Sequence, residues 1–208
     1  ERLADDVAAL VRALGADRAH VVGHDWGGLI AWQLAMRHPQ VVDRLAILNA
    51  PHPARFRRLL LDPRQGLRSW YVAFFQLPWL PERVLGANGR RALRRTLRAM
   101  HLAPGSLTRE DLARYDAAFR GRGALGAALA YYRALFRRAA HVPGAHRRIT
   151  ARTLLLWGER DPALVAANTE GLERWLPELE VVRFPEAGHW VMADAPEAVN
   201  ARIVRFLS

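Results

Sequence analysis

The sequence contains no cysteine and no lysine among its 208 residues. The lack of cysteine excludes disulfides, thiolate catalysis and cysteine-bound metals. It fits a reducing cytoplasm, which we take as the expected location. No apolar run approaches the roughly 18 residues that span a bilayer, so we expect no membrane span. Hydrophobic residues make up 51% of the chain, and this proportion indicates a globular protein rather than a disordered one.

Because lysine is missing, all 31 basic residues are arginines, and the formal net charge is +11. Such an excess can indicate a nucleic-acid or anionic-membrane partner. Arginine and alanine are abundant together, however, which is typical of a GC-rich coding background. The densest run, residues 89–101, spaces its arginines as one solvated helix face would. Since the sequence has no zinc-finger, RRM or KH signature, we expect no nucleic-acid partner.

The first 53 residues alternate between helical and strand patterns. An apolar stripe at helical spacing ends at Gly15, and short apolar runs follow it. Short connections between such segments favour a parallel sheet. The expected elements are a helix over 1–14, a strand over 19–25, a helix over 27–39 and a strand within 42–53.

Residues 54–147 show helical periodicity and no convincing strand pattern; the candidate helices are 67–76, 81–100, 108–119 and 123–140. The alternation then returns, with strands predicted over 152–159 and 179–189 and helices over 163–177 and 196–208. The economical interpretation is an α/β core formed by residues 1–53 and 148–208. An all-helical insertion, residues 54–147, interrupts that core.

Three residues that can do chemistry follow predicted strands: Asp25, Asp161 and His189. Catalytic groups gather at the carboxyl edge of open α/β sheets. Each residue alone has a simpler explanation, because aspartates cap helices and turns and a histidine can lie in a loop without a task. Together they occur in the chain order of nucleophile, acid and histidine, which favours a catalytic triad.

The segment GHDWGG (23–28) resembles the nucleophile elbow of α/β-hydrolases, with aspartate in place of serine. Three further segments are similar to the same group: NAPHP (49–53), WGERDPAL (157–164) and EAGHW (186–190). That group contains epoxide hydrolases and haloalkane dehalogenases, and the chain is closest to the epoxide hydrolases. The resemblance implies an α/β-hydrolase fold, here partial, whose mostly parallel sheet is flanked by helices and carries an inserted helical cap.

Two segments of the insertion resemble the epoxide hydrolase branch in particular. SWYVAFFQLPWLPE (69–82) is similar to the first cap segment, in which a tyrosine faces the nucleophile, and Tyr71 takes that place. AYYRALFR (130–137) is similar to the second, where the matching tyrosine is Tyr132, with Tyr131 as the alternative. Phe75 and the other aromatic residues near Tyr71 favour a small apolar organic epoxide as the substrate.

The resemblance also implies a mechanism. The Asp25 carboxylate is anionic at neutral pH and needs no base, so it attacks an epoxide carbon and forms an ester. The two tyrosines assist the departing oxygen, and water activated by His189 and Asp161 then hydrolyses the ester to a vicinal diol. The backbone N–H of Trp26 stabilises the oxyanion. Water is the co-substrate, and the reaction requires no metal or organic cofactor.

Two alternatives remain open at this point. A haloalkane or haloacid dehalogenase would use the same triad, with its halide held by donors such as Trp26, and an inactive α/β-hydrolase scaffold would bind without catalysis. In the family, a second oxyanion donor comes from a His-Gly-x-Pro loop, which does not occur before Asp25. We therefore expect an N-terminally truncated member of the family. The sequence indicates neither the individual epoxide nor the oligomeric state.

Overall fold

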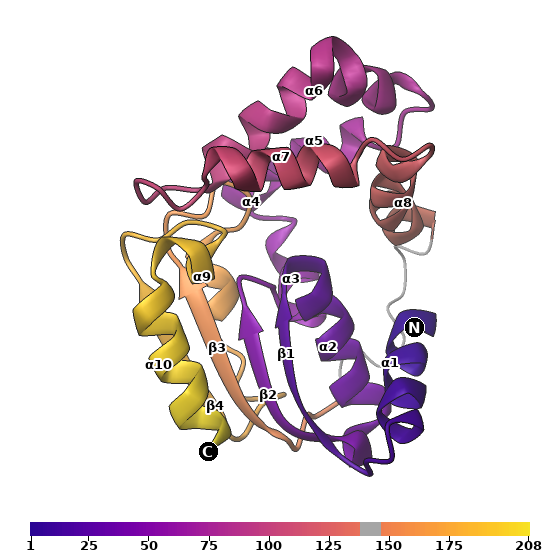
Figure 1. Ribbon diagram of the computed structural model, residues 1–208. Helices are drawn as coiled ribbons and strands as arrows, with labels where there is room; N and C mark the ends of the chain where they lie inside the picture. Colours follow the sequence, from indigo (N-terminus) through magenta and orange to yellow (C-terminus); the bar gives the residue numbers. More distant parts are fainter. Residues whose placement is uncertain (138–146) are drawn as a thin grey trace.

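A computed structural model describes residues 1–137 and 147–208 (Figure 1). Four strands form one parallel sheet in the order β1-β2-β3-β4, which confirms the predicted parallel core. The strands are β1 (Ala19–His24), β2 (Val42–Leu48), β3 (Arg152–Gly158) and β4 (Leu179–Phe184).

The register of the sheet brings the ends of all four strands to one edge. His24 pairs with Leu48, Leu48 with Leu156, and Gly158 with Phe184. Because the strands are parallel, the residues that follow them emerge side by side at this carboxyl edge. The sheet thereby gathers the segments that carry Asp25, Asp161 and His189.

Helices cover both faces of the sheet (Figure 1). In β2, Leu45 and Ile47 pack against α1 (Arg2–Ala13) and α2 (Asp25–Arg37), while Ala46 and Leu48 pack with α10 (Pro196–Leu207). This alternation follows from the two-residue period of a strand. Both faces of β2 are apolar, as expected for a central parallel strand.

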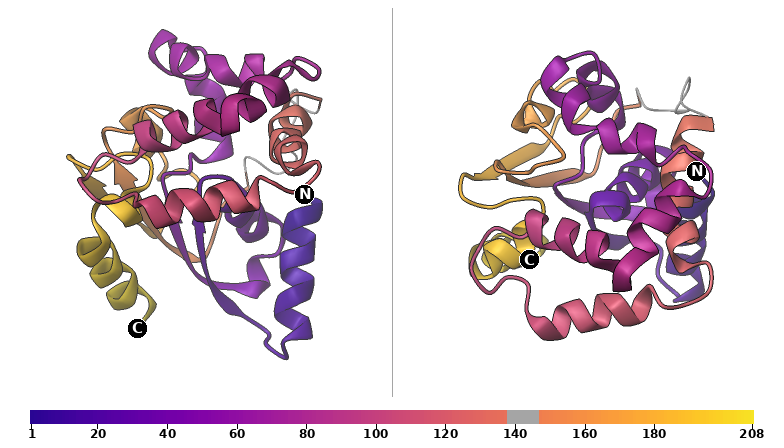
Figure 2. Two further views of the ribbon diagram at one scale, coloured as in Figure 1. Left: turned by 45° about the horizontal axis from the view of Figure 1, so that its top comes forward. Right: turned by 90° about the horizontal axis from the view of Figure 1, so that it is seen from above.

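The described residues between β2 and β3 form a layer of six helices that lies over the carboxyl edge of the sheet (Figures 1 and 2). Within the described part of this segment no strand forms, and the end of the predicted helix 123–140 lies outside the described residues. We call these helices the helical layer: α3 (Pro53–Leu59), α4 (Pro63–Arg68), α5 (Trp70–Phe74), α6 (Leu80–Met100), α7 (Arg109–Ala118) and α8 (Ala124–Arg137).

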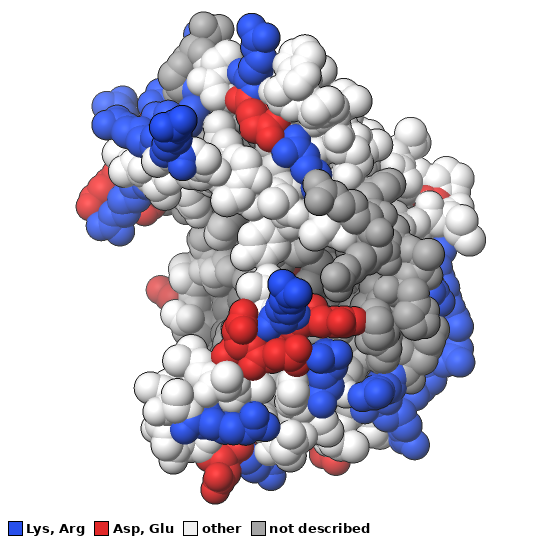
Figure 3. Space-filling view, turned by 90° about the vertical axis from the view of Figure 1, so that its right-hand side faces the viewer, with Lys and Arg blue, Asp and Glu red and all other residues white. Residues whose placement is uncertain are grey.

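The arginine run of residues 89–101 lies on α6 and is only partly solvated. Arg91, Arg95 and Arg98 are exposed, as predicted. Arg90 and Arg94 instead pair with the buried Asp116 of α7, so two of the cations hold the helical layer together. On the face shown in Figure 3, arginine and carboxylate side chains also lie side by side.

The prediction of a helix over residues 163–177 is wrong. This segment forms only the short 3₁₀ helix η2 (Ala166–Thr169) and turns. Gln65 and Arg68 donate to the carbonyl groups of Ala163 and Leu164, which a helix would pair with N–H groups four positions further on, and Gly171 has a left-handed φ of 64°. Tertiary hydrogen bonds therefore replace the local helical ones.

Three smaller differences concern element ends and one short helix. The predicted helix 67–76 is divided at Ser69 between α4 and α5. The predicted strand 179–189 ends at Phe184, so His189 lies in a loop, and the helix α9 (Val191–Asp194) follows that loop. Among the helices of the described residues, none combines the length and the apolar character that crossing a bilayer requires.

Candidate active site

The turn after β1 is strained and tightly packed. Asp25 has a φ of 49°, in the left-handed region that side chains rarely adopt. A Cβ atom on Gly28 would lie 2.3 Å from the Cβ of Ala50, and one on Gly23 would lie 2.7 Å from the Gly27 oxygen. Gly23 thus lets β1 approach α2, and Gly28 lets α2 approach the segment after β2. The Asp25 side chain emerges 42% exposed at the carboxyl edge.

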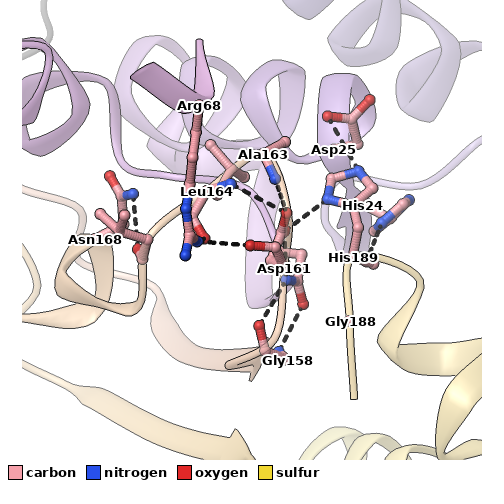
Figure 4. A network of polar contacts seen from close by, with 12 residues as sticks. His24, Asp25, Arg68, Gly158, Asp161, Ala163, Leu164, Asn168, Gly188 and His189 are labelled. Atoms are coloured by element: carbon pink, nitrogen blue, oxygen red, sulfur yellow. Dashed lines mark hydrogen bonds and ion pairs between the residues drawn. The ribbon is translucent and has the colours of Figure 1, made fainter. Parts of the chain in front are cut away.

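The three residues singled out from the sequence meet at this edge (Figure 4). The Nδ1–H of His189 donates to Oδ2 of Asp161 at 2.7 Å. On the other side of the ring, His189 Nε2 lies 3.6 Å from Oδ1 of Asp25, which is beyond a good hydrogen bond but close enough for charge attraction. The imidazole therefore lies between two carboxylates.

Asp161 is buried and its carboxylate is saturated with hydrogen bonds. Its Oδ1 accepts from the backbone N–H groups of Ala163 at 2.8 Å and Leu164 at 3.0 Å. Its Oδ2 accepts from Asn49 Nδ2 at 2.8 Å as well as from His189. These donors fix the carboxylate in one orientation.

Asn49 was not identified from the sequence. It follows β2 with a φ of 37°, is fully buried, and also accepts the N–H of Gly158 at 2.9 Å through Oδ1. Its side chain joins the ends of β2 and β3 and holds Asp161 at the same time. The available signal was its position: a polar residue directly after a buried strand, at the same edge as Asp25 and Asp161.

His24 is a second residue that sequence reasoning missed. Its Nε2–H donates to the backbone oxygen of His189 at 2.9 Å, and its ring lies 4.8 Å from the rings of both His189 and Trp190. Burial, followed by the nearby charge of His189, lowers the pKa of His24. At neutral pH His24 is therefore an uncharged donor that holds the loop carrying His189.

The pKa of His189 shifts in the opposite direction. Burial disfavours the charged imidazolium, but the hydrogen bond and charge of Asp161, followed by the charge of Asp25, outweigh it and raise the pKa. An imidazole with a raised pKa accepts a proton readily near neutral pH.

Tyr71 on α5 and Tyr132 on α8 meet in the helical layer, with ring centroids 5.9 Å apart. Burial, followed by the charge of Asp25, raises the pKa of Tyr132 to about 12. Burial, followed by the charges of Tyr132 and Asp25, also raises the pKa of Tyr71. Phe75 packs edge-on against the two rings, at 5.5 Å from Tyr71 and 4.9 Å from Tyr132. The two phenols stay protonated at neutral pH and are available as hydrogen-bond donors.

The neighbouring Tyr131 is placed differently from Tyr132. Its side chain is exposed, and its ring contacts Trp26 at 5.3 Å. Tyr132 is half-buried and contacts Trp26, Tyr71 and Phe75. Of the two residues, Tyr132 is therefore the one that lies in the aromatic group with Tyr71.

Trp26 follows Asp25 at the start of α2. Its backbone N–H belongs to the first helical turn, where N–H groups have no acceptor within the helix. Its indole forms a hydrogen bond with the Tyr132 side chain, which moderates the raised pKa of that phenol. Residues 1–24 form α1 and β1, and they contain no counterpart of the second oxyanion donor that the resemblance implies.

Two cavities lie beside this group of residues rather than on it. One, of about 460 Å³, is lined by His101, Tyr115 and Trp190 among others. The other, of about 420 Å³, borders Arg160 and Asp194, and neither is lined by Asp25. We assign the site to the surroundings of Asp25 because His189, held by Asp161, and the Tyr71–Tyr132 pair converge there. Among the described residues, no group of His, Asp or Glu side chains is arranged to hold a metal ion.

Known proteins resemble the chain over almost its whole length. The human protein epoxide hydrolase 4 is 35% identical, and the match covers 99% of this chain and 58% of that protein. The AB hydrolase superfamily protein YfhM of Bacillus subtilis is 34% identical, with 100% of this chain and 72% of that protein covered. The chain therefore spans little more than half of the human relative.

Structural comparison gives the same family. The crystal structure of a mutant epoxide hydrolase from Bacillus megaterium superposes with a TM-score of 0.88 at 28% identity, over 98% of this chain and 74% of that one. A family model described as alpha/beta hydrolase fold matches residues 1–196. The chain belongs to the alpha/beta hydrolase fold family.

Proposed function

We propose that this protein opens apolar organic epoxides to vicinal diols, with Asp25 as the nucleophile. The observation that carries the proposal is the convergence of Asp25 with His189 on one side and with the Tyr71–Tyr132 pair of the helical layer. The epoxide hydrolases among its relatives support the same activity.

In the first step, a carboxylate oxygen of Asp25 attacks one epoxide carbon from the side opposite the carbon–oxygen bond. That bond breaks, and the resulting ester joins Asp25 to the substrate. Tyr71 and Tyr132 donate hydrogen bonds to the departing oxygen, and one of them transfers a proton to it. Because an alkoxide is a poor leaving group, this acid assistance increases the rate on the order of 10²- to 10⁴-fold.

In the second step, His189 accepts a proton from water as the water oxygen attacks the ester carbonyl of Asp25. Asp161 stabilises the imidazolium that forms. The N–H of Trp26 stabilises the oxyanion. When this intermediate collapses, the His189 imidazolium gives its proton to the departing alcohol oxygen, and the diol is released. The proton left on the Asp25 carboxyl group returns to the phenolate formed in the first step, which restores the carboxylate and both phenols.

The proposal assigns different tasks to the two parts of the chain. Residues 1–53 and 148–208 form a core that supplies the nucleophile, the acid and the histidine. The helical layer acts as a cap that supplies both tyrosines, and Phe75 provides an apolar wall beside them. An aromatic surface of this kind favours an aryl epoxide, such as styrene oxide, as a probe substrate.

The alternative of haloalkane hydrolysis requires the same Asp25, Asp161 and His189. A halide leaves without a proton, so it gives no task to two buried phenols. The ring of Trp26, whose indole would hold a halide, also packs edge-on against Tyr132, with ring centroids 5.0 Å apart. For these reasons we favour the epoxide.

The proposal is tested by a single turnover of styrene oxide in water labelled with heavy oxygen, followed by mass spectrometry of the protein and the product. Hydrolysis through an Asp25 ester places the label in the Asp25 carboxylate, because the diol takes its new oxygen from the enzyme. Label found in the diol alone means direct attack by water and contradicts the covalent route.

A matched variant separates the two steps. In His189→Gln the ester should form but not hydrolyse, so the protein mass increases by the mass of one epoxide molecule. Release of halide from bromoalkanes, without diol from styrene oxide, would establish the dehalogenase alternative instead.

A further inference from the structure

The short helix α4 belongs to the helical layer, but its polar side chains bind the loop that follows β3. Gln65 is fully buried, and its Nε2 donates to the backbone oxygen of Ala163 at 2.9 Å and to Ser69 Oγ at 3.0 Å. Its Oε1 accepts from Val165 N–H and from Asn168 Nδ2, both at 3.0 Å. The amide of Gln65 thus satisfies its hydrogen-bonding capacity, mostly on that loop.

Arg68, one helical turn further on, binds the same loop. Its Nη1 donates to the backbone oxygen of Asp161 at 2.7 Å and to that of Leu164 at 3.2 Å (Figure 4). Hydrogen bonds from a charged guanidinium are stronger than those between neutral groups. Two side chains of α4 therefore bind the backbone of Asp161, Ala163, Leu164 and Val165.

These contacts complement those made by the Asp161 side chain. The carboxylate accepts the N–H groups of Ala163 and Leu164, whereas α4 binds the carbonyl groups of the same two residues. The turn is held from the carboxylate side and from the α4 side at once. Its backbone conformation decides where the Asp161 carboxylate points, so α4 contributes directly to that direction.

We propose that Gln65 and Arg68 are positioning residues that aim the Asp161 carboxylate at His189. The inference rests on the proposed function, in which Asp161 and His189 activate water. It gives the helical layer a second task besides carrying Tyr71 and Tyr132. In this proposal the Asp161 carboxylate takes its direction only when α4 packs on the loop after β3. The triad therefore forms together with the helical layer.

The protonation of His189 reports on this positioning. Three titratable groups face the His189 ring or its backbone: Asp161 after β3, Asp25 at the start of α2, and His24 at the end of β1. A misdirected Asp161 carboxylate stabilises the imidazolium less, so the pKa of His189 falls. Removal of the Arg68 charge alone would shift the pKa in the opposite direction, because a nearby cation disfavours the imidazolium.

The test compares Arg68→Ala with Arg64→Ala and Arg68→Lys by NMR titration of isotope-labelled histidine. Arg64 lies on the same helix, is exposed and pairs with Asp62, so it is the matched control. We expect Arg68→Ala to lower the pKa of His189 and to weaken the downfield Nδ1–H resonance. We expect Arg64→Ala to leave the pKa of His189 and the Nδ1–H resonance unchanged. In Arg68→Lys, both should return most of the way to their wild-type values.

Kinetics give a second readout. In Arg68→Ala, kcat should fall by roughly 10²-fold, the size expected when a catalytic group is misplaced by about 1 Å, while KM changes little. Gln65→Met removes the four hydrogen bonds without changing the charge and should act in the same direction as Arg68→Ala. If Gln65→Met fails to fold, Arg68→Ala decides the question alone.

A wild-type titration curve and Nδ1–H resonance in folded Arg68→Ala would overturn the proposal. The NMR readout needs no substrate, so it is independent of the proposed epoxide reaction. If Arg68→Ala lowers the pKa of His189 but the wild-type protein makes no diol, the positioning role stands and the proposed function fails.

Discussion

Asp161 and Asp25 flank the same histidine, and their surroundings differ sharply. The Asp161 side chain is fully buried and accepts hydrogen bonds from Ala163, Leu164, Asn49 and His189. The Asp25 side chain is 42% exposed, has a strained φ of 49°, and lies 3.6 Å from His189 Nε2. One carboxylate is held by its neighbours, and the other projects from a tight turn.

The difference separates two tasks that a carboxylate can perform. A carboxylate whose lone pairs are all occupied is fixed in direction but has no electron pair free for a substrate. An exposed carboxylate that accepts few hydrogen bonds keeps its nucleophilicity. The strain in the backbone of Asp25 is of the kind that accumulates at functional sites. Under the proposed function, Asp161 orients His189 and Asp25 attacks the epoxide.

The largest expected effect is that of Asp25→Ala on activity. Without the nucleophile no ester forms, so kcat for styrene oxide should fall on the order of 10⁴-fold or more. The stability should change by no more than about 1 kcal/mol, because the lost side chain is half exposed. Steady-state kinetics and urea denaturation measure both quantities. Asp6→Ala, at an exposed position on α1, is the control.

Asp161→Ala should reduce activity less but also destabilise the protein. It leaves the N–H groups of Ala163 and Leu164 and the Nδ1–H of His189 without their acceptor, and Asn49 Nδ2 keeps only the Gly158 oxygen at 3.3 Å. The expected cost is about 2 to 4 kcal/mol in the free energy of unfolding. Activity should fall on the order of 10³- to 10⁴-fold, as for other triads that lose the acid. Equal stability losses in the Asp25 and Asp161 variants would remove the contrast between the two residues.

Much of the scaffold for this contrast could be predicted from the sequence. β2 and β3 contain continuous apolar runs in the sequence, which is typical of strands in a parallel sheet. In the structure both runs are buried on both faces, as this pattern predicts. Catalytic side chains in the segments that follow parallel strands emerge at the same edge of the sheet. For that reason Asp25, Asp161 and His189 can be singled out from the sequence alone.

The environments of these residues could not be predicted, because they depend on contacts between distant parts of the chain. Gln65 accepts the N–H of Val165, which is 100 positions away, and Asn49 donates to Asp161 across 112 positions. Gln65 and Arg68 also donate to the carbonyl groups of Ala163 and Leu164, and these distant donors explain why the predicted helix over 163–177 does not form. The local periodicity of a sequence does not indicate which distant residue will bind a given backbone group. It therefore cannot predict that a tertiary hydrogen bond replaces a helical one.

The tight turn around Asp25 predicts a difference between two adjacent glycines. In Gly28→Ala the new Cβ would lie 2.3 Å from that of Ala50, so α2 and the segment after β2 must separate, whereas a Cβ on Gly27 meets nothing within 4 Å. We expect Gly28→Ala to cost about 1 to 3 kcal/mol in unfolding free energy. Gly27→Ala should be neutral or slightly stabilising, because alanine favours the helix. Equal effects in thermal denaturation would contradict this packing of the turn.

The smallest effect concerns the charge that each aspartate places on His189. Burial lowers the pKa of this histidine, but Asp161, by hydrogen bond and charge, and then Asp25, by charge, raise it overall. Asp161→Asn and Asp25→Asn should therefore both lower the pKa of His189 in an NMR titration, and Asp161→Asn should lower it more. Ester formation removes the charge of Asp25 in the same way as Asp25→Asn.

The rate of ester hydrolysis, measured by rapid quench, should therefore fall with decreasing pH around an apparent pKa below that of His189 in the free wild-type protein. We expect the two pKa values to differ by about one pH unit. Coincidence of the two values would mean that the Asp25 charge does not reach His189, and the contrast between the two aspartates would then rest on exposure and hydrogen bonding alone.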